Sequence, residues 1–291
     1  MASAELRDTR RRIKSVQATQ KITRAMELIA AARIPRASAR VIASKPYTAK
    51  LVEVINNVGN AAGGASHMLL ERREVRTAGL LVVSSDRGLA GAYASTIIRM
   101  AEQRIIDLKR VGIDVRIFAV GKKAQSYFRY RGYRIEKAYL GITDTPGYGD
   151  ARAIANALME SYAAGDVDTV EAFYTRFQSA MTQVATTFEF LPIEPPRIQG
   201  ETKRVSYSFE PSPALILDRL LPRFVEALTF NMLLEASASE HSARRRAMKA
   251  ATDNAEELIK TLTVTANRAR QAEITTEISE IVGGAEALTK G

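Results

Sequence analysis

The spacing of hydrophobic residues divides this chain into two kinds of segment. Residues 3–57, and the chain from about residue 213 onward, carry apolar residues at helical spacing. Residues 78–170 instead alternate short apolar runs with amphipathic stretches. Short apolar runs are typical of buried strands, whereas a repeating stripe is typical of a helix. The pattern therefore predicts two long helices, one on each side of a compact domain in the sequence.

The C-terminal helix shows the most regular pattern. One series recurs at alternating steps of three and four: Met248, Ala251, Ala255, Leu258, Leu262, Thr265, Ala269 and Ala272. A 3.5-residue period predicts a coiled-coil seam, and its small residues require a close partner helix. A second series then starts out of phase: Ile274, Ile278, Ile281, Ala285 and Leu288. We expect the partner helix to end near Ala272, and Gly283 and Gly284 to mark a fraying end.

The N-terminal helix is expected to be that partner. Its predicted apolar stripe consists of Ile13, Val16, Ile22, Met26 and Ile29, and Ser3 can cap its start. We interpret a second group as polar surface: Thr9, Gln17, Thr19, Gln20 and Thr23. Because a domain separates the two helices, they can pair only in antiparallel order, with Leu258 near Ile13. Bends are expected at Pro35 and Pro46, an interruption at Pro222, and a helix break over Gly59 to Gly64.

The middle of the chain predicts an α/β domain with a largely parallel sheet. The expected strands are residues 78–85, 114–121, 134–141, 167–177 and 182–193, and the expected helices are residues 92–112, 122–131 and 149–165. A Pro-rich link follows. The predicted organisation is a helix over residues 1–58, a Rossmann-like domain over residues 75–195 and a helix over residues 211–288.

Composition narrows the possible chemistry. The net charge is +10, and residues 1–40 hold ten Arg or Lys against three carboxylates, which suits an acidic partner. With no Cys, disulfides, Cys-ligated zinc and thiol catalysis are excluded. No run approaches the ~18 apolar residues of a membrane span, and the N-terminus lacks the apolar core of a signal peptide. The default expectation is a soluble, intracellular, bacterial protein.

No segment carries a recognisable catalytic, metal or cofactor site. The turn SDRGLAG at residues 85–91 lies where a Rossmann fold binds phosphate, but it lacks both G-x-G-x-x-G and the P-loop pattern. We interpret it as a structural turn. The two histidines, His67 and His241, lack metal-ligand spacing, and we interpret His241 and its serine neighbours as packing and capping groups.

Four ordered segments resemble the gamma subunit of bacterial F-type ATP synthases. They are the run from Arg10 to Ile34, the SDRGLAG turn, the aromatic and acidic VSYSFEP segment at residues 205–211, and the chain from Ser239 onward. The resemblance spans essentially the whole chain. Ala90 stands where many relatives carry Cys, and no Cys-bearing insert follows, so thiol regulation of the chloroplast type is excluded. Pro35 interrupts a helix that is usually unbroken.

The resemblance implies a rotary shaft with no catalytic site, metal or cofactor of its own. The two long helices would form the antiparallel central stalk inside the alpha–beta hexamer, while the inserted domain would sit with the epsilon subunit on the c-ring. Proton-driven rotation of the ring would drive ATP synthesis on beta. One copy per complex, no nucleic acid, and membrane contact only through the c-ring are implied. The location would be peripheral, on the cytoplasmic face of the bacterial plasma membrane.

The resemblance also implies three sets of partner-binding residues. Those expected near acidic loops of beta are Met26, Arg33, Arg36 and Arg244. Those expected at the foot, on the c-ring, are Tyr207, Phe209 and Glu210. Those expected in an apolar sleeve at the top of the hexamer are Ile274, Ile278 and Ile281.

Two other functions fit parts of the sequence. A nucleotide-dependent α/β enzyme with helical arms is disfavoured by the missing phosphate loop. A basic coiled-coil protein that binds nucleic acid is disfavoured by the nearly neutral C-terminal helix.

Overall fold

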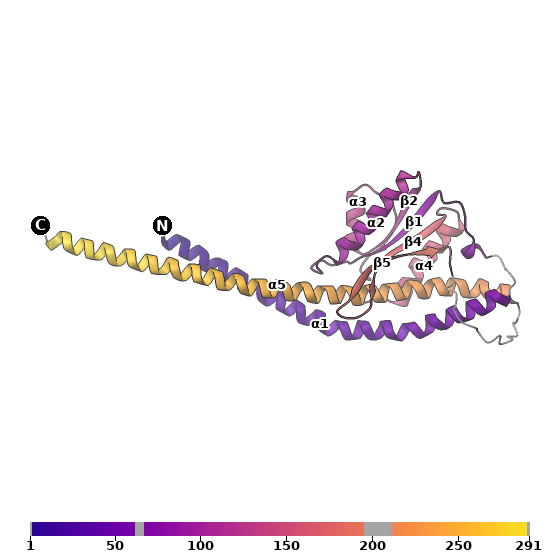
Figure 1. Ribbon diagram of the computed structural model, residues 1–291, viewed down its shortest axis with the longest axis horizontal. Coiled ribbons are helices and arrows are strands. Elements are labelled where there is room, and N and C mark those ends of the chain that lie inside the picture. Colours follow the sequence, from indigo (N-terminus) through magenta and orange to yellow (C-terminus); the bar gives the residue numbers. More distant parts are fainter. Residues whose placement is uncertain (1, 62–66, 195–209, 211, 290–291) are drawn as a thin grey trace. The chain divides into compact units, whose positions relative to one another are not determined.

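A computed structural model describes residues 2–61, 67–194, 210 and 212–289 (Figure 1). Its elements, in chain order, are α1 (Ala2–Ala61), the 3-10 turn η1 (Met68–Leu70), β1 (Thr77–Val83), α2 (Tyr93–Arg110), β2 (Asp114–Val120), α3 (Lys122–Tyr130), β3 (Ile135–Tyr139), α4 (Tyr148–Ala163), β4 (Thr169–Phe177), β5 (Gln183–Leu191) and α5 (Pro213–Thr289). The chain forms two compact units, which we call the central unit (residues 31–244) and the terminal unit (residues 1–30 and 245–291).

The central unit is built on a five-stranded sheet in the order β3-β2-β1-β4-β5. β1 pairs in parallel with β2 and β4, and β2 pairs in parallel with β3, whereas β5 runs antiparallel to β4. Helices α2, α3 and α4 connect successive parallel strands, which is the arrangement that alternating strands and helices favour. The predicted fold class, an α/β domain between two long helices, is confirmed.

The sheet is buried on both faces because its residues alternate between two cores. In β1, Leu80 and Val82 belong to the core beneath α2 and α3. Leu81 and Val83 belong to the core on the opposite face, with residues of α4, α1 and α5. Figure 1 shows α2 and α3 on one side of the strands and α4 with this part of α5 on the other. A strand buried on both faces reads as a continuous apolar run.

Both long helices contribute to the core of the central unit. Leu51 and Ile55 of α1 pack in the same cluster as Leu221 and Phe224 of α5. Pro222 lies between these buried positions, and α5 continues through it, so the predicted interruption is wrong. An internal Pro costs about 3 kcal/mol, and burial of the neighbouring apolar side chains offsets that cost. Helix α1 likewise continues through both of its prolines.

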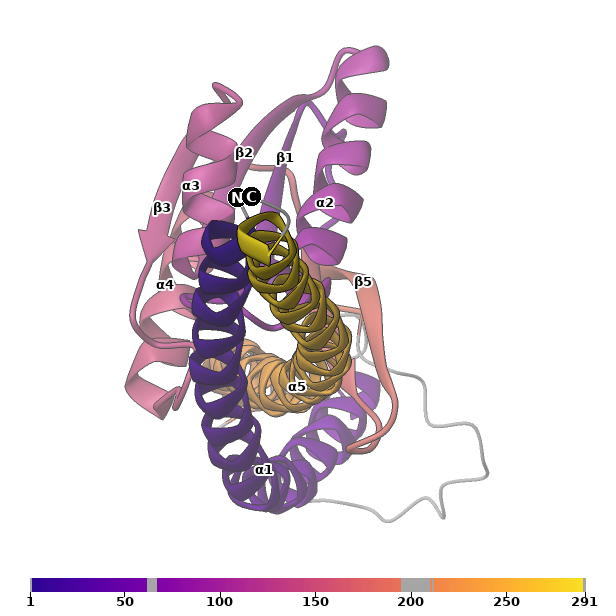
Figure 2. The same ribbon diagram turned by 90° about the vertical axis from the view of Figure 1, so that its left-hand side faces the viewer.

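The terminal unit is an antiparallel coiled coil, in which the first part of α1 lies beside the last part of α5. Figure 1 shows the two helices crossing along this unit, with α5 extending past the start of α1. Figure 2 shows the same two helices from the side on which both chain ends lie. The buried and half-buried positions of α1 in this unit that repeat at heptad spacing are Leu6, Thr9, Ile13, Val16, Gln20, Thr23, Glu27 and Ala30. Those of α5 that repeat at the same spacing are Met248, Thr252, Ala255, Ile259, Leu262, Ala266, Ala269 and Glu273. Both series advance by alternating steps of three and four, as a heptad seam requires.

The predicted seam of α5 is half right. Four predicted positions lie in the seam: Met248, Ala255, Leu262 and Ala269. The other four seam positions each lie one residue after the predicted one: Thr252, Ile259, Ala266 and Glu273. Thr252 is buried and its hydroxyl lies 2.8 Å from that of Thr23, whereas Leu258 is 46% exposed. Leu258 and Ile259 are both apolar, so hydrophobicity alone cannot decide which of them enters the seam.

The predicted stripe of α1 also needs correction. Ile22 and Ile29 are 61% and 54% exposed, whereas Thr9 and Thr23, interpreted as surface, are each 8% exposed. Threonine satisfies its hydroxyl within the helix, as Thr23 does by donating to the Gln20 carbonyl at 3.1 Å, and so it can enter a narrow seam. Thr23 lies opposite Thr252. Since both helices rise equally per residue, Ile13, ten residues before Thr23, lies opposite Leu262, ten residues after Thr252. The predicted partner of Ile13, Leu258, lies one helical turn away.

One predicted helix end is wrong as well. Helix α1 begins at Ala2, so Ser3 lies within its first turn and not at its cap. The helix ends at Ala61, inside the stretch from Gly59 to Gly64 where the break is predicted. Helix α5 continues through Gly283 and Gly284 to Thr289. The heptad burial in α5 nevertheless ends at Glu273, and residues 274–285 are exposed in this structure. The division of the sequence into three domains stays a prediction.

Candidate functional site

The turn at residues 85–91 connects β1 to α2 at the C-terminal edge of the sheet. The carboxylate of Asp86 accepts the backbone N–H of Lys122 at 3.1 Å and that of Thr143 at 3.2 Å. Burial alone would raise the pKa of Asp86, but backbone donors from Gly141, Thr143 and Lys122 hold that pKa below its ordinary value. Asp86 therefore ties together the loops that follow three neighbouring strands, which supports a structural role for this turn.

One glycine position explains the close packing beside the turn. Gly121, at the end of β2, has a φ of +90°, and a Cβ there would lie 2.8 Å from the carbonyl carbon of Ser85. Both the backbone conformation and the space require glycine. In the turn itself, Leu89 adopts a positive φ of 63°, a strained conformation for a side chain of this size.

A buried ion pair on α5 reaches the same turn. Glu240 and Arg244, one helical turn apart, are 2% and 8% exposed. The guanidinium of Arg244 donates to Glu240 Oε1 at 2.5 Å and to the Gly88 carbonyl at 3.3 Å. Burial raises the pKa of Glu240 above its ordinary value, although the bond from Arg244 opposes this effect. Both of these bonds come from Nη2 of Arg244, whose N–H donors are thus used inside the central unit.

A second polar cluster joins α1, α5 and the loop before α4. Arg33 of α1 forms an ion pair with Asp144. The ring of His241 lies 3.3 Å from the Asp144 carbonyl oxygen, and the Ser237 hydroxyl donates to that same oxygen at 2.9 Å. Burial lowers the pKa of His241, which favours the neutral imidazole. The contacts of His241 agree with its interpretation as a packing group. In the described part of the chain, no three acidic or histidine side chains come together to hold a metal ion.

The remaining predicted site residues are distributed along the two helices. Met26 is half-buried and Arg36 is exposed. The isoleucines of the second series, Ile274, Ile278 and Ile281, are 46%, 56% and 72% exposed. Tyr207 and Phe209 lie outside the described residues, while Glu210 is described and exposed. Their partner contacts stay predictions.

The terminal unit carries further exposed apolar side chains that the sequence did not point to. Leu28 is 58% exposed and Val264 is 50% exposed. The sequence offers one indication of this exposure, since each residue is apolar yet lies outside the regular apolar stripe of its helix. An apolar side chain at a non-seam position of a two-helix coil faces solvent or another protein.

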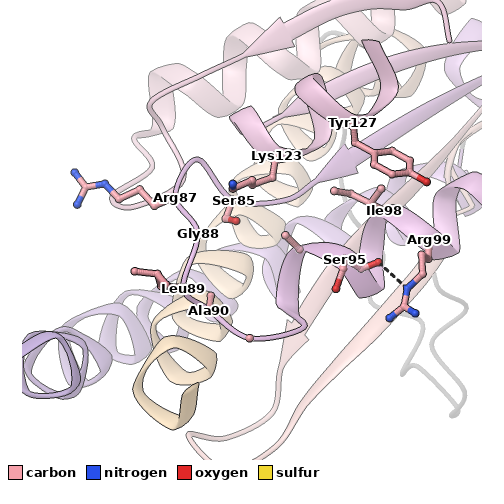
Figure 3. A pocket seen from close by; sticks show the side chains of 12 residues that line it. Ser85, Arg87, Gly88, Leu89, Ala90, Ser95, Ile98, Arg99, Lys123 and Tyr127 are labelled. Carbon is pink, nitrogen blue, oxygen red and sulfur yellow. Dashed lines mark hydrogen bonds between the residues drawn. The ribbon is translucent and has the colours of Figure 1, made fainter. Parts of the chain in front are cut away.

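A pocket lies beside the SDRGLAG turn, between the starts of α2 and α3 (Figure 3). It lies at the C-terminal end of β1, where open α/β sheets bind ligands. Figure 3 shows Lys123 directed toward the turn near Ser85, while the guanidinium of Arg87 points away. The residues lining it include no acidic side chain.

Comparison with known proteins decides the family. A family model described as ATP synthase matches residues 5–288. The chain belongs to the ATP synthase gamma-chain family. An ATP synthase gamma chain of Parafrankia sp. (strain EAN1pec) is 47% identical, with 99% of each chain covered. One from Pelotomaculum thermopropionicum is 44% identical, with 97% of this chain and 99% of the relative covered. The family predicted from the four sequence segments is confirmed.

Solved structures support the fold of this gamma-chain family member. A chain in the OSCP/F1/c-ring structure of Euglena gracilis mitochondrial ATP synthase, in rotational state 3, aligns with a TM-score of 0.67 at 17% identity. The alignment covers 98% of this chain and 95% of that one. A chain in the central stalk/c-ring structure of the Tetrahymena thermophila enzyme aligns with a TM-score of 0.60 at 21% identity, covering 79% and 99%. Among the described residues, no helix is long and apolar enough to cross a membrane.

Proposed function

We propose that this chain is the central rotary shaft of a bacterial F-type ATP synthase. The observation that carries the proposal is the near-complete alignment, at 47% identity, with a protein named ATP synthase gamma chain. The chain is the non-catalytic stalk subunit of that complex, and the ATP chemistry takes place on beta. The antiparallel coil supports this function because a slender two-helix rod is suited to the inside of a hexamer.

The shaft acts by binding different conformations of beta with different free energies. A partner can shift a conformational equilibrium only by such a difference in affinity. As the c-ring turns the shaft under proton flow, each beta subunit meets a different face of the coil in turn. Exposed apolar residues on one helix, such as Ile22 and Ile29, provide a surface that can contact beta without a bond that must break at every step.

The basic part of α1 meets acidic loops of beta. Support comes from the excess of seven positive charges in residues 1–40 and from the exposure of Arg36. Met26 lies in the same helix, half-buried at the edge of the seam. Arg33 is part-exposed and pairs with Asp144, so beta would compete with that pair. Arg244, the predicted partner residue on α5, acts chiefly by holding the turn at Gly88, because its guanidinium already donates to the Gly88 carbonyl and to Glu240.

The end of α5 turns in an apolar sleeve formed by alpha and beta. Three isoleucines beyond the seam are about half exposed or more, and a group of exposed apolar side chains is a mark of a protein contact. Ile274, Ile278 and Ile281 follow the last seam position of α5, so α1 does not cover them.

Another part of the chain docks on the membrane sector. Tyr207, Phe209 and Glu210 rest on polar loops of the c-ring, and the epsilon subunit binds beside the α/β domain. One copy serves each complex, coupled to protons, on the cytoplasmic face of the bacterial plasma membrane. The support is the family membership, since Tyr207 and Phe209 lie outside the described residues.

Reconstitution tests the function directly. The full-length chain, mixed with the alpha and beta subunits of a bacterial relative, should enter a stable complex that hydrolyses ATP. A surface-tethered bead attached to an exposed site on this chain should then rotate during hydrolysis. A chain that stays outside the hexamer, or a complex that hydrolyses ATP while the bead stays still, would contradict the proposal. Binding to nucleic acid in place of the hexamer would favour the basic coiled-coil alternative.

A further inference from the structure

The pocket beside the SDRGLAG turn combines three features that a structural turn does not require. It has a volume of about 660 Å³ and opens between the starts of two helices (Figure 3). Its lining comes from the turn, from the first two turns of α2 and from α3. The lining residues used below are Ser85, Ala94, Ser95, Arg99 and Lys123.

The first feature is a buried hydroxyl without a partner. Ser85 is 1% exposed, and its Oγ has no hydrogen-bond partner in the structure. The backbone of the same residue is fully used, since its N–H donates to Ser84 Oγ at 2.6 Å and its carbonyl accepts the N–H of Lys123 at 3.0 Å. A buried polar group left without a bond is unfavourable, and such groups are rare in folded proteins. An incoming acceptor would relieve that cost.

The second feature is the N-terminus of α2, where the N–H of Tyr93 donates to the Ala90 carbonyl at 3.3 Å, which leaves the N–H groups of Ala94 and Ser95. This helix has 18 residues, no side-chain hydrogen bond at its N-cap Ala92, and no acidic residue in its first turn. The hydroxyls of Ser95 and Thr96 donate to the Ala92 carbonyl, at 3.1 and 2.8 Å, and therefore do not cap the first N–H groups. Ala94 and Ser95 line the pocket. The first N–H groups of a helix lack intrahelical acceptors and carry a partial positive charge.

The third feature is the charge of the walls. Lys123 lies next to Ser85, and Arg99 lies on the α2 side, where its Nε donates to the Ser95 carbonyl at 3.2 Å (Figure 3). The nearest acidic group in the sequence, Asp86, does not line the pocket. Its carboxylate accepts backbone N–H groups of the neighbouring loops.

We propose that this pocket binds a phosphate-type oxyanion. The donors are the Ser85 hydroxyl, the Lys123 ammonium and the backbone N–H groups of Ala94 and Ser95 in the first turn of α2. Helix N-termini with backbone donors and a nearby cation form anion sites in many folds. The chain has neither glycine-rich phosphate pattern, so the site holds one phosphate group with few donors. The ligand is inorganic phosphate or the terminal phosphate of a nucleotide, and the site adds a binding activity to the stalk function.

Calorimetric titration of the full-length chain with inorganic phosphate tests the site. Ionic strength is held constant with chloride, and ADP is titrated in a parallel arm. We expect one saturable site for phosphate, for ADP, or for both, and the arm that binds identifies the source of the phosphate group. Lys123→Ala should weaken binding about tenfold, the size of one charge-assisted hydrogen bond. Ser85→Ala should weaken it several-fold.

Lys122→Ala is the matched control. Lys122 is the next residue on α3, it is exposed, and it is absent from the lining of the pocket. The variant therefore removes the same charge without removing a ligand contact, and its affinity should equal that of the unaltered chain. Equal weakening in both lysine variants would reduce the effect to general charge attraction and overturn the proposal. Absence of saturable heat in both arms would overturn it as well.

Thermal unfolding provides a second measurement that is independent of binding heat. Without ligand, Ser85→Ala should be at least as stable as the unaltered chain, because it removes an unsatisfied hydroxyl. With the ligand, the midpoint should rise more in the unaltered chain than in the variant. An equal rise in both would show that the hydroxyl does not contact the anion.

Discussion

Removing the guanidinium of Arg244 should destabilise the chain more than any surface charge change. In Arg244→Ala, the 2.5 Å bond to Glu240 and the 3.3 Å bond to the Gly88 carbonyl are lost together. Glu240 is 2% exposed, so its carboxylate would remain buried without a counter-charge. Breaking a buried pair in this way costs about 3–5 kcal/mol. Urea unfolding of the full-length chain, followed by circular dichroism, measures that loss.

The loss should depend on pH in a definite direction. Burial already raises the pKa of Glu240 in the folded state, and loss of Arg244 raises that pKa further. A carboxyl with a raised folded-state pKa destabilises the fold at pH values above that pKa, where it must be buried as an anion. The penalty falls as the pH is lowered through the folded-state pKa toward the ordinary glutamate value. The difference between Arg244→Ala and the unaltered chain should therefore shrink on acidification.

Two controls make this prediction refutable. Arg245→Ala removes the same charge from the adjacent exposed position and should change stability by less than about 0.5 kcal/mol. Combining Glu240→Leu with Arg244→Met replaces the pair by apolar groups, and should recover most of the loss. If Arg244→Ala is as mild as Arg245→Ala, or if the double variant is as unstable as the single one, the buried pair does not hold this region together.

Three further predictions concern the coil and its partners. Met26→Lys adds a charge among the cations of α1 and should lower proton pumping per ATP hydrolysed more than the hydrolysis rate itself; equal loss of both would count against a contact with beta. Ile278→Asp with Ile281→Asp should impair assembly with the alpha–beta hexamer in gel filtration, and normal assembly would place the apolar sleeve elsewhere. Thr23→Val and Thr252→Val should show a coupling free energy of about 0.5–1 kcal/mol in a double-mutant cycle, because their hydroxyls lie 2.8 Å apart; zero coupling would remove that contact from the seam.

The α/β domain could be predicted from the sequence because its strands are buried on both faces. β1 has six buried residues out of seven, and so the run stands out from any amphipathic helix. The turns between elements can also be recognised in the sequence, because glycines such as Gly121 mark them. These signals are local, and each is strong enough to be read within a few residues.

The polar contacts of the candidate site could not be predicted in the same way. Arg33 and Asp144 are more than one hundred residues apart, and Arg244 is farther still from Gly88 in sequence. No local feature of the sequence distinguishes an arginine that is hydrogen-bonded within the fold from one that is available to a partner protein. The sequence predicts Arg33 and Arg244 at a partner surface. In the structure Arg33 pairs with Asp144, and Arg244 is buried. Which charges remain available depends on tertiary packing.

The seam of the terminal unit shows where hydrophobic periodicity becomes ambiguous, and it gives a sharp test. In the sequence, Leu258 fits the repeat; in the structure it is 46% exposed, and Ile259 is half-buried instead. Removing a buried aliphatic side chain costs about 2–5 kcal/mol, and Ile259→Ala should reach the lower part of that range. Leu258→Ala, a change of the same size one residue away, should cost less than about 1 kcal/mol, since surface changes are usually mild.

Unfolding of the isolated full-length chain is the right measurement for this pair. In the assembled enzyme, any contact between Leu258 and a partner subunit would be lost as well, and assembly would mix the two effects. A larger loss in Leu258→Ala than in Ile259→Ala would restore the seam predicted from the sequence and refute the one in the structure. If Ile259→Ala alone is destabilising, Leu258 is left as outward-facing apolar surface. Leu258→Ala should then leave the coil intact, because the residue lies outside the seam.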